Sequence, residues 1–398
     1  MYLPEEIIVV REVLGEPVTR LILKRCAGVP VQMVETNKSR KIAEASQILR
    51  SVSGLPERIA AGKKVLALIS TADVIHLFDM PDGRMGCPHF LKLVLATNGC
   101  PYECAWCYLR LTYRGNWPFM AVRVRYDRIL KKILRYVKKN SSVVTLFNMG
   151  ELQDGLALES LIGTAQVLIP FFAELPNCYL FILTKSDDVG PILRLRHNGH
   201  TILAWSLNAP EVSRDFEIGA PPFERRLRAA QLAEKAGYPI RFRLDPIVPV
   251  SGWETMYAEA IEEIFEQIAP ERITLGTLRF EEEYINNRRS IVGEGKCEAR
   301  LLAEMEKMVP MLPPKQIFLR ERGKKVSMKT KVSVGKYSYP SELRVELFRF
   351  AIGEIRKYFG GPIALCKEVK EVWNTVGLDH RHCRCVCQYD EAELFCNQ

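Results

Sequence analysis

A short loop of this sequence carries three cysteines at a spacing suited to a metal cluster. The segment reads Thr97-Asn-Gly-Cys100-Pro-Tyr-Glu-Cys104-Ala-Trp-Cys107-Tyr108, so the spacing is C-x3-C-x2-C. Thiolates are the usual ligands of iron–sulfur clusters, and three of them occupy three corners of a four-iron cube and leave the fourth iron open. A structural zinc site needs a fourth protein ligand, which this stretch does not supply. The spacing therefore favours an open-corner [4Fe–4S] cluster over two alternatives, a zinc site or thiols that bind nothing.

A second group of cysteines near the end of the sequence offers four more thiolates. They are Cys366, Cys383, Cys385 and Cys387, with His380 and His382 as substitutes. Four thiolates saturate a tetrahedral zinc or all four corners of a second iron–sulfur cluster. Spacing does not separate metals that share a preference for thiolates. We therefore predict that this segment holds an auxiliary iron–sulfur cluster, zinc, or redox-active or hydrogen-donating thiols.

Alternating strand-like and helical patterns predict the scaffold that holds the first loop. Helical period is clearest at 129–138, where apolar residues fall on one face and basic residues on the other, and it recurs near 156–174, 188–198, 223–237 and 255–268. Strand–helix units in series indicate a parallel sheet buried on both sides, with ligands at the carboxyl ends of its strands. Six units are too few for a closed barrel, so we predict an α/β fold with a partial (β/α)6 barrel over 91–285. The predicted strands are Leu91–Thr97, Val143–Met149, Tyr179–Thr184, Ile202–Leu207, Ile240–Ile247 and Ile273–Phe280.

Three further regions flank the predicted barrel. Residues 1–90 read as a small N-terminal α/β appendage, with strands Ile7–Val10 and Val29–Val34 around a helix near 16–25. Residues 286–358 read as a C-terminal helical and β region. The cysteine-rich extension over 359–398 is predicted to be organised by a metal.

The composition excludes several classes of protein. The chain has 398 residues, of which 47% are hydrophobic and 26% charged, so fibrous and wholly disordered proteins are excluded. The longest apolar stretch, Leu161 to Phe172, is closed by Glu174 and is too short to span a membrane. The sequence opens with acidic residues and shows no leader peptide, so we expect a cytoplasmic protein without a membrane partner. The formal net charge of +9 favours a polyanionic partner without identifying one.

The first cysteine loop resembles the cluster-binding loop of radical S-adenosylmethionine (SAM) enzymes. The resemblance implies that Cys100, Cys104 and Cys107 are the ligands of a [4Fe–4S] cluster and that its open iron binds SAM. In that superfamily the reduced cluster cleaves SAM to methionine and a 5′-deoxyadenosyl radical, which abstracts a hydrogen atom from the substrate. The six-unit barrel agrees with this resemblance.

Polar residues at later strand ends resemble the SAM-binding positions of the same superfamily. In Asn148-Met149-Gly150-Glu151, Gly150 would let the backbone approach SAM and Glu151 would accept from its ammonium group. Glu151 could equally open a helix and complement its dipole. Lys185 would pair with the SAM carboxylate, and Ser206 and Asn208 would bond its polar groups. The alternative is that these residues are solvated or cap helices.

Several segments carry a closer resemblance. They are Cys107-Tyr108-Leu109, Ile202 to Ala209, Arg225 through Pro239, Pro246-Ile247 with Gly252-Trp253-Glu254, and Val334-Gly-Lys-Tyr337. In these segments, and over most of residues 1–358, the chain resembles the spore photoproduct lyase family. That family reverses a methylene-bridged thymine dimer in DNA, and a cysteine returns a hydrogen atom to the product radical. The resemblance implies a DNA-repair lyase that breaks a carbon–carbon bond.

The chain departs from that family at the hydrogen-returning cysteine. Met149 stands at its position, and a thioether has no S–H to donate. Tyr108 matches a tyrosine that the family uses in hydrogen return, although it could instead pack beside the cluster with its hydroxyl bonded. A thiol among Cys383 to Cys387, such as Cys385, could return the hydrogen instead.

Two classes of substrate agree with the sequence. A DNA substrate needs a basic surface with aromatic residues near the barrel mouth. The alternative is a radical SAM enzyme that modifies a peptide or small molecule, with the C-terminal cysteines holding an auxiliary cluster. Either enzyme needs a reductant such as flavodoxin or ferredoxin, and the sequence does not specify the oligomeric state. The candidates for DNA contact are Arg110, Arg114, Arg123 and Arg125 with Trp117 and Tyr126, then Arg241, Arg243 and Arg288-Arg289. Arg123 and Arg125, which alternate with Val122 and Val124, also suit the solvated face of an ordinary strand.

Overall fold

A large, mostly parallel sheet forms the centre of the computed structural model, which describes residues 2–78, 90–115, 117–142, 144–293, 295–311, 315–319 and 330–382. Within these residues the sheet has eight strands in the order β18-β12-β11-β10-β9-β8-β5-β4, and neighbours are parallel from β5 to β18. The sheet thus contains the predicted strands in whole or in part and is extended by β18 at one edge and by antiparallel β4 at the other. The strand predicted over Ile273–Phe280 is too long, because the barrel strand ends at Thr277 and Arg279–Glu281 pairs in a separate antiparallel sheet. The strands are β4 (Ile75–Phe78), β5 (Phe90–Leu93), β8 (Thr145–Asn148), β9 (Cys178–Thr184), β10 (Thr201–Leu207), β11 (Ile240–Ile247), β12 (Arg272–Thr277) and β18 (Ile363–Leu365).

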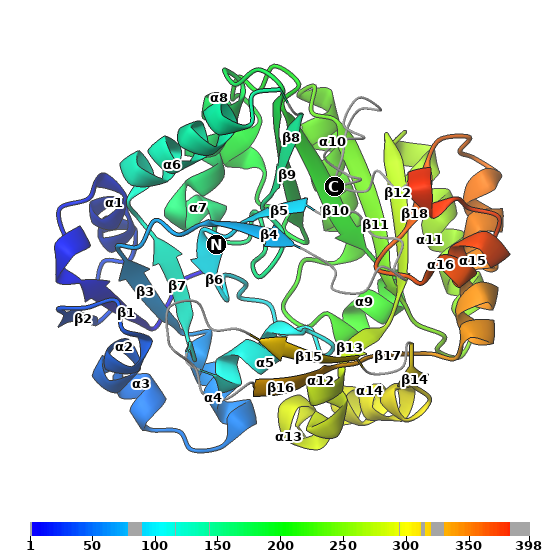
Figure 1. Cartoon of the computed structure of the whole chain (residues 1–398), viewed down its shortest axis with the longest axis horizontal. Helices are drawn as coiled ribbons and strands as arrows, with labels where there is room; N and C mark the ends of the chain where they lie inside the picture. Colours follow the sequence, from blue (N-terminus) through cyan, green and yellow to red (C-terminus); the bar gives the residue numbers. More distant parts are fainter. Residues whose placement is uncertain are drawn as a thin grey trace.

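Helices cover the outer face of this curved sheet (Figure 1). In α6 the apolar residues Ile129 and Ile133 are buried and the basic ones lie opposite, as the periodicity predicts. The helix predicted over 188–198 is wrong: only the 3-10 turn Gly190–Ile192 forms there. Leu193 and Leu195 are two residues apart, a spacing that would place them on different faces of a helix. The helices between the strands are α6 (Tyr126–Lys139), α7 (Glu159–Ile162), α8 (Thr164–Phe172), α9 (Pro210–Phe216), α10 (Phe223–Lys235) and α11 (Trp253–Gln267). Of these, α7 packs with the second sheet, since Leu161 and Ile162 belong to the hydrophobic core of that sheet.

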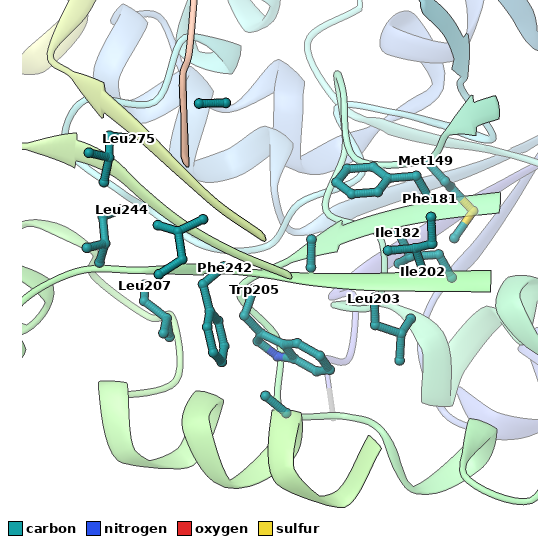
Figure 2. Close-up of a cluster of buried hydrophobic side chains, with 14 of the residues drawn as sticks. Met149, Phe181, Ile182, Ile202, Leu203, Trp205, Leu207, Phe242, Leu244 and Leu275 are labelled. Atoms are coloured by element: carbon teal, nitrogen blue, oxygen red, sulfur yellow. The ribbon is translucent and has the colours of Figure 1, made fainter. Parts of the chain in front are cut away.

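The parallel register separates an apolar outer face of the sheet from a polar inner face. Paired residues on neighbouring parallel strands point to the same face, and successive residues alternate between faces. Leu203, Trp205 and Phe242 lie on the side that faces a helix (Figure 2). The opposite face carries the row of hydrogen-bonded neighbours Ser206, Arg243, Thr274 and Ala364.

A second sheet lies beside the first at the N-terminal end of the chain (Figure 1). Its order is β2-β1-β3-β7-β6, so it takes in two strands from beyond residue 90. The single strand predicted over Leu91–Thr97 is therefore divided between two sheets. The side-chain oxygen of Gln153 accepts from the N–H groups of Leu95 and Ala96, which removes both from the barrel ladder. The elements are β1 (Glu6–Val10), α1 (Pro17–Arg25), β2 (Val31–Val34), α2 (Ser39–Ala45), α3 (Gln47–Arg50), α4 (Leu55–Gly62), β3 (Val65–Ile69), β6 (Ala96–Thr97) and β7 (Met120–Arg123).

Short helices and small antiparallel sheets follow β12. None of the helices in the described part of the chain is long and apolar enough to cross a membrane. The elements are β13 (Arg279–Glu281), α12 (Glu282–Asn286), α13 (Arg288–Val292), α14 (Lys296–Glu306), β14 (Val309–Pro310), β15 (Lys315–Leu319), β16 (Thr330–Val334), β17 (Lys336–Ser338), α15 (Ser341–Arg356) and α16 (Lys370–Thr375).

Trp205 is the side chain whose loss should cost the barrel most. It is fully buried, and its indole nitrogen donates to the carbonyl of Ser186 at 2.9 Å. Trp205→Ala should lower the free energy of unfolding by about 3–5 kcal/mol, because it leaves a cavity in the outer core. Urea denaturation of the full chain measures this. Leu14→Ala, at a residue that is 43% exposed, is the control and should change stability by no more than about 0.5 kcal/mol. An equal effect of both substitutions would contradict the assigned packing.

Candidate functional site

The cysteine loop lies between β6 and α5 (Leu109–Arg114) and is fastened to a segment that follows β10. The N–H of Glu103 donates to the carbonyl of Ile218, and the N–H of Ala105 donates to the carbonyl of Phe216, both at 2.8 Å. Trp106 stacks on Phe216 with ring centroids 5.2 Å apart. The positions of the three cysteines are therefore fixed by backbone bonds to the barrel and by an aromatic contact.

The three thiols are close enough to act on one another electrostatically. Burial raises the pKa of Cys104 to about 12, with a further rise from Glu217 and a partial offset from Lys185. Burial also raises the pKa of Cys100, and Asp154, Cys107 and Cys104 add to the rise. Within the described residues, no three His, Cys, Asp or Glu side chains converge as ligands of one metal ion.

The donor set fits an iron–sulfur cluster in chemical type. Cys100, Cys104 and Cys107 are free thiols on one loop, in a small apolar cluster with Tyr102 and Ala157. Binding to metal would replace their protons, since a coordinating thiol is deprotonated. An apolar shell of this kind limits access of water to a cluster and influences its potential.

Two predicted SAM-binding residues meet directly. The Lys185 ammonium donates to the Ser206 hydroxyl at 2.8 Å. It also lies 3.5 Å from Glu217, which is completely buried. Burial by itself would lower the pKa of Lys185, but Glu217 and Cys104 outweigh it and the pKa is raised. Lys185 is thus a charged group beside the cysteine loop.

Glu217 is a site residue that the sequence analysis missed. Its carboxylate accepts from Arg226 and Ser213 and pairs with Lys185. Burial tends to raise the pKa of Glu217, but the two cations lower it below its usual value. Removing one partner of such a buried pair costs about 3–5 kcal/mol. No sequence pattern signals this residue, because the interaction joins three separate elements.

Lys63, at the end of α4, was also missed. It is 7% exposed, and its charge lowers the pKa of both Cys100 and Cys104. A buried cation of this kind would favour thiolates. Lys63 comes from the N-terminal region, which the sequence predicts to be a small α/β appendage.

Gly150 and Glu151 lie at the end of β8, near Tyr108. A Cβ on Gly150 would lie 2.3 Å from the Cβ of Leu183, so only glycine fits there. The Glu151 carboxylate lies 3.6 Å from the Lys367 ammonium. The Tyr108 hydroxyl accepts from the N–H of Leu152 at 2.8 Å, and 42% of the residue is exposed. Glu151, Tyr108 and the residue after Cys366 therefore come together.

The side-chain amide of Asn208 is hydrogen-bonded to residues other than Glu151, Tyr108 and Lys367. Its side chain donates to the Pro246 carbonyl at 2.8 Å and accepts from the Tyr257 hydroxyl at 2.6 Å. It also accepts from the N–H of Ala209. These bonds connect the ends of β10 and β11, so Asn208 has a structural part in holding the rim.

Met149 lies in the hydrophobic core, where it is 1% exposed (Figure 2). Its N–H continues the ladder from β8 by donating to the carbonyl of Phe181 at 2.7 Å. The side chain therefore packs within the protein.

Cys366 lies at the carboxyl end of β18 and is 4% exposed. Arg243 donates to its sulfur, and Arg279 holds the nearby Asp245 carboxylate with bonds of 2.9 and 3.0 Å. A Cβ on Gly276 would lie 2.3 Å from a carboxylate oxygen of Asp245, so a larger residue there would displace that side chain. The other predicted C-terminal ligands, Cys383, Cys385 and Cys387, lie outside the described residues.

Most candidate DNA-contacting arginines bond within the protein. Arg125 pairs with Glu12 and Glu16, and Arg241 pairs with Glu271. Arg123 is 8% exposed and donates to Thr97. These side chains hold elements of the fold together, and their part in phosphate binding stays a prediction. Of the remaining candidates, Arg110 and Arg288 donate to backbone carbonyls, Tyr126 is bonded to Thr164, Trp117 packs on Phe119, and Arg289 is exposed.

Known proteins are similar to this chain in sequence and in fold. The family model for spore photoproduct lyase matches residues 90–360. The spore photoproduct lyase of Clostridium acetobutylicum is 25% identical over 262 residues, which is 66% of this chain and 72% of that protein. The enzyme of that name from Bacillus subtilis is 32% identical over 167 residues, which is 42% of this chain and 48% of that protein.

Solved structures of spore photoproduct lyase have the same fold. A complex with dinucleoside spore photoproduct has a TM-score of 0.71 and 23% identity, and the match covers 92% of this chain and 99% of that one. A double mutant with bound AdoMet and dinucleoside spore photoproduct has a TM-score of 0.70 and 23% identity, with coverage of 91% and 98%. These matches confirm the predicted partial barrel. Since the family model spans the greater part of the sequence, this chain belongs to the spore photoproduct lyase family of radical SAM proteins.

Proposed function

We propose that this chain is a radical SAM lyase that breaks a carbon–carbon bond in a thymine photoproduct of DNA. The observation that carries the proposal is the meeting of the cysteine loop with Glu151, Lys185 and Ser206 at the carboxyl edge of one parallel sheet. Ligands of open α/β sheets bind at that edge. The relatives named above are spore photoproduct lyases, and one solved structure of a mutant spore photoproduct lyase holds AdoMet and dinucleoside spore photoproduct together.

The cysteine loop would hold the cofactors. Cys100, Cys104 and Cys107 would bind a [4Fe–4S] cluster, and SAM would occupy its open iron. When bound and reduced, this pair supplies a 5′-deoxyadenosyl radical for hydrogen abstraction. Lys185 would meet the SAM carboxylate, because its ammonium already lies between Ser206 and the cysteine loop. Glu151 would accept from the SAM ammonium and exchange its ion pair with Lys367 for that bond.

Tyr108 would orient groups at the mouth of the barrel. Its oxygen accepts from the N–H of Leu152, so its own O–H hydrogen is directed elsewhere. A phenol can donate and accept hydrogen bonds at once. The O–H of Tyr108 would therefore be able to take part in hydrogen return while its oxygen accepts from Leu152.

Finer parts of the proposal concern the rest of the chain. Cys383, Cys385 and Cys387 would bind a second iron–sulfur cluster or zinc, with a fourth ligand from Cys366 or a neighbouring histidine. A flavodoxin or ferredoxin would supply electrons.

Replacement of the loop thiols tests the cofactor assignment. Cys100→Ala, Cys104→Ala and Cys107→Ala should each remove about four iron atoms per chain and abolish SAM cleavage, because each takes a ligand from the cluster. Iron and sulfide analysis of anaerobically purified protein measures the loss. Cys297→Ala, outside the loop, is the matched control and should keep its iron. Full iron content in the loop variants would refute the assignment.

Lys185 should determine SAM affinity. Lys185→Met should raise the KM for SAM by about 10–100-fold, because a hydrogen bond to a charged group contributes about 1.5–3 kcal/mol. Steady-state release of 5′-deoxyadenosine measures KM, and iron content shows that the cluster is retained. Lys185→Arg should restore part of the affinity. An unaltered KM in Lys185→Met would show that Lys185 does not bind SAM and serves only to neutralise Glu217.

The rate of SAM cleavage in the presence of different DNA molecules tests which substrate the enzyme uses. DNA that carries the thymine photoproduct should accelerate release of 5′-deoxyadenosine, and the same duplex without the lesion should not. Binding to DNA should weaken as salt rises, because phosphate contacts release counterions. Turnover that does not respond to either DNA would favour a peptide or small-molecule substrate instead.

A further inference from the structure

Cys366 faces the interior of the barrel. On β18, Ala364 pairs with Thr274 of β12, and Thr274 pairs with Arg243 of β11. The N–H of Cys366 donates to the carbonyl of Leu275 at 2.6 Å, so the ladder continues through this residue. Two residues beyond Ala364, Cys366 therefore lies on the same inner face as Arg243.

The contacts around Cys366 fix the position of its sulfur. Arg243 donates to the sulfur and also lies 3.6 Å from the carboxylate of Asp245. Arg279 holds that carboxylate through two hydrogen bonds. The sulfur of Cys366 is therefore held by a network of charged side chains on the inner face of the sheet.

Cys366 is also connected to the proposed SAM site. Lys367, the next residue, lies 3.6 Å from Glu151, the proposed acceptor of the SAM ammonium. Among the described thiols outside the cysteine loop, Cys26 lies just after α1, Cys178 begins β9 at its amino end, and Cys297 lies in α14. Cys366 alone of these is at the carboxyl edge of the barrel.

Asn148 independently indicates that a molecule binds inside this barrel. It is fully buried at the end of β8, on the same face as its neighbour Lys92 of β5. Its side-chain oxygen accepts from the N–H of Gly150 at 2.9 Å, but its side-chain nitrogen has no acceptor among the described residues. A buried donor without an acceptor costs about 1–3 kcal/mol. A ligand with an acceptor group would remove that cost.

We infer that Cys366 donates the hydrogen atom that completes the reaction, a role that Met149 cannot fill. The inference rests on the proposed function. The S–H bond of Cys366 breaks homolytically, and its hydrogen forms a new C–H bond on the product radical. The sulfur is left as a thiyl radical. One electron from the flavodoxin- or ferredoxin-type reductant and one proton from water restore the thiol.

This role excludes Cys366 from the C-terminal metal site. A thiolate bound to metal has no hydrogen to give. The second metal would then take its fourth ligand from another residue, such as His380 or His382.

Cys366→Ser is the variant that tests the inference, because a serine keeps the shape and hydrogen bonds but its O–H bond is too strong to yield a hydrogen atom. The reaction is run in D2O with photoproduct DNA. The wild-type product should carry deuterium from the exchanged thiol. In Cys366→Ser, repaired product per 5′-deoxyadenosine released should fall at least about 10-fold, the scale on which loss of a positioned proton or hydrogen donor acts. Cys297→Ser is the control and should match the wild type.

Two measurements that do not depend on turnover distinguish the outcomes. Iron content and melting temperature of Cys366→Ser should equal those of the wild type; lost iron would make Cys366 a metal ligand and overturn the inference. Wild-type stoichiometry and deuterium content in Cys366→Ser would overturn it as well. A wild-type protein that releases 5′-deoxyadenosine but does not respond to photoproduct DNA would instead refute the proposed function, and the inference with it.

Discussion

The register of the parallel strands is the constraint on which the site depends. Because β5 through β18 run in the same direction, the chain leaves every strand at one edge, and residues distant in sequence meet there. Lys185 after β9, Ser206 in β10 and Cys366 after β18 are brought to this edge by the same ladder. A shift of one residue in any strand would turn its inner side chains to the apolar outer face. The fully buried Trp205 and Phe242 resist such a shift, since their places on the outer face are filled by the core.

A buried charge cluster connects the cysteine loop to this edge. Glu217 pairs with Lys185 and Arg226, and the carbonyls on either side of it accept the bonds from the cysteine loop. Buried charges are tolerated when they are paired and hydrogen-bonded. These charged side chains thus fix the backbone that positions Cys104, and they keep Lys185 charged. The proposed SAM contact of Lys185 therefore depends on the same interactions that position the proposed iron–sulfur cluster.

The sequence predicts the strands and the cysteine loop well because both are local patterns. Continuous apolar runs place β8 through β12, and the thiol spacing does not depend on the rest of the fold. The errors have nonlocal causes. The run over Leu91–Thr97 divides because Gln153, far along the chain, bonds its backbone. The strand β18 was missed because it is short and lies in a segment read as metal-organised.

The remaining unpredicted features are contacts between elements. The pairing of Lys367 with Glu151, the bonds of Asn208 and the place of Cys366 beside Arg243 all require the assembled barrel. Spacing alone suggested Cys366 as a partner of the later cysteines, whereas the fold places it on the inner wall.

The most direct test of the account is electron–nuclear double resonance on the reduced, anoxic protein with nitrogen-15-labelled SAM. The predicted result is a coupling between the iron–sulfur cluster and the amino nitrogen of SAM. A reduced cluster without that coupling would contradict the account, as would a metal ion bound to Cys100, Cys104 and Cys107 with no coordination position open to SAM.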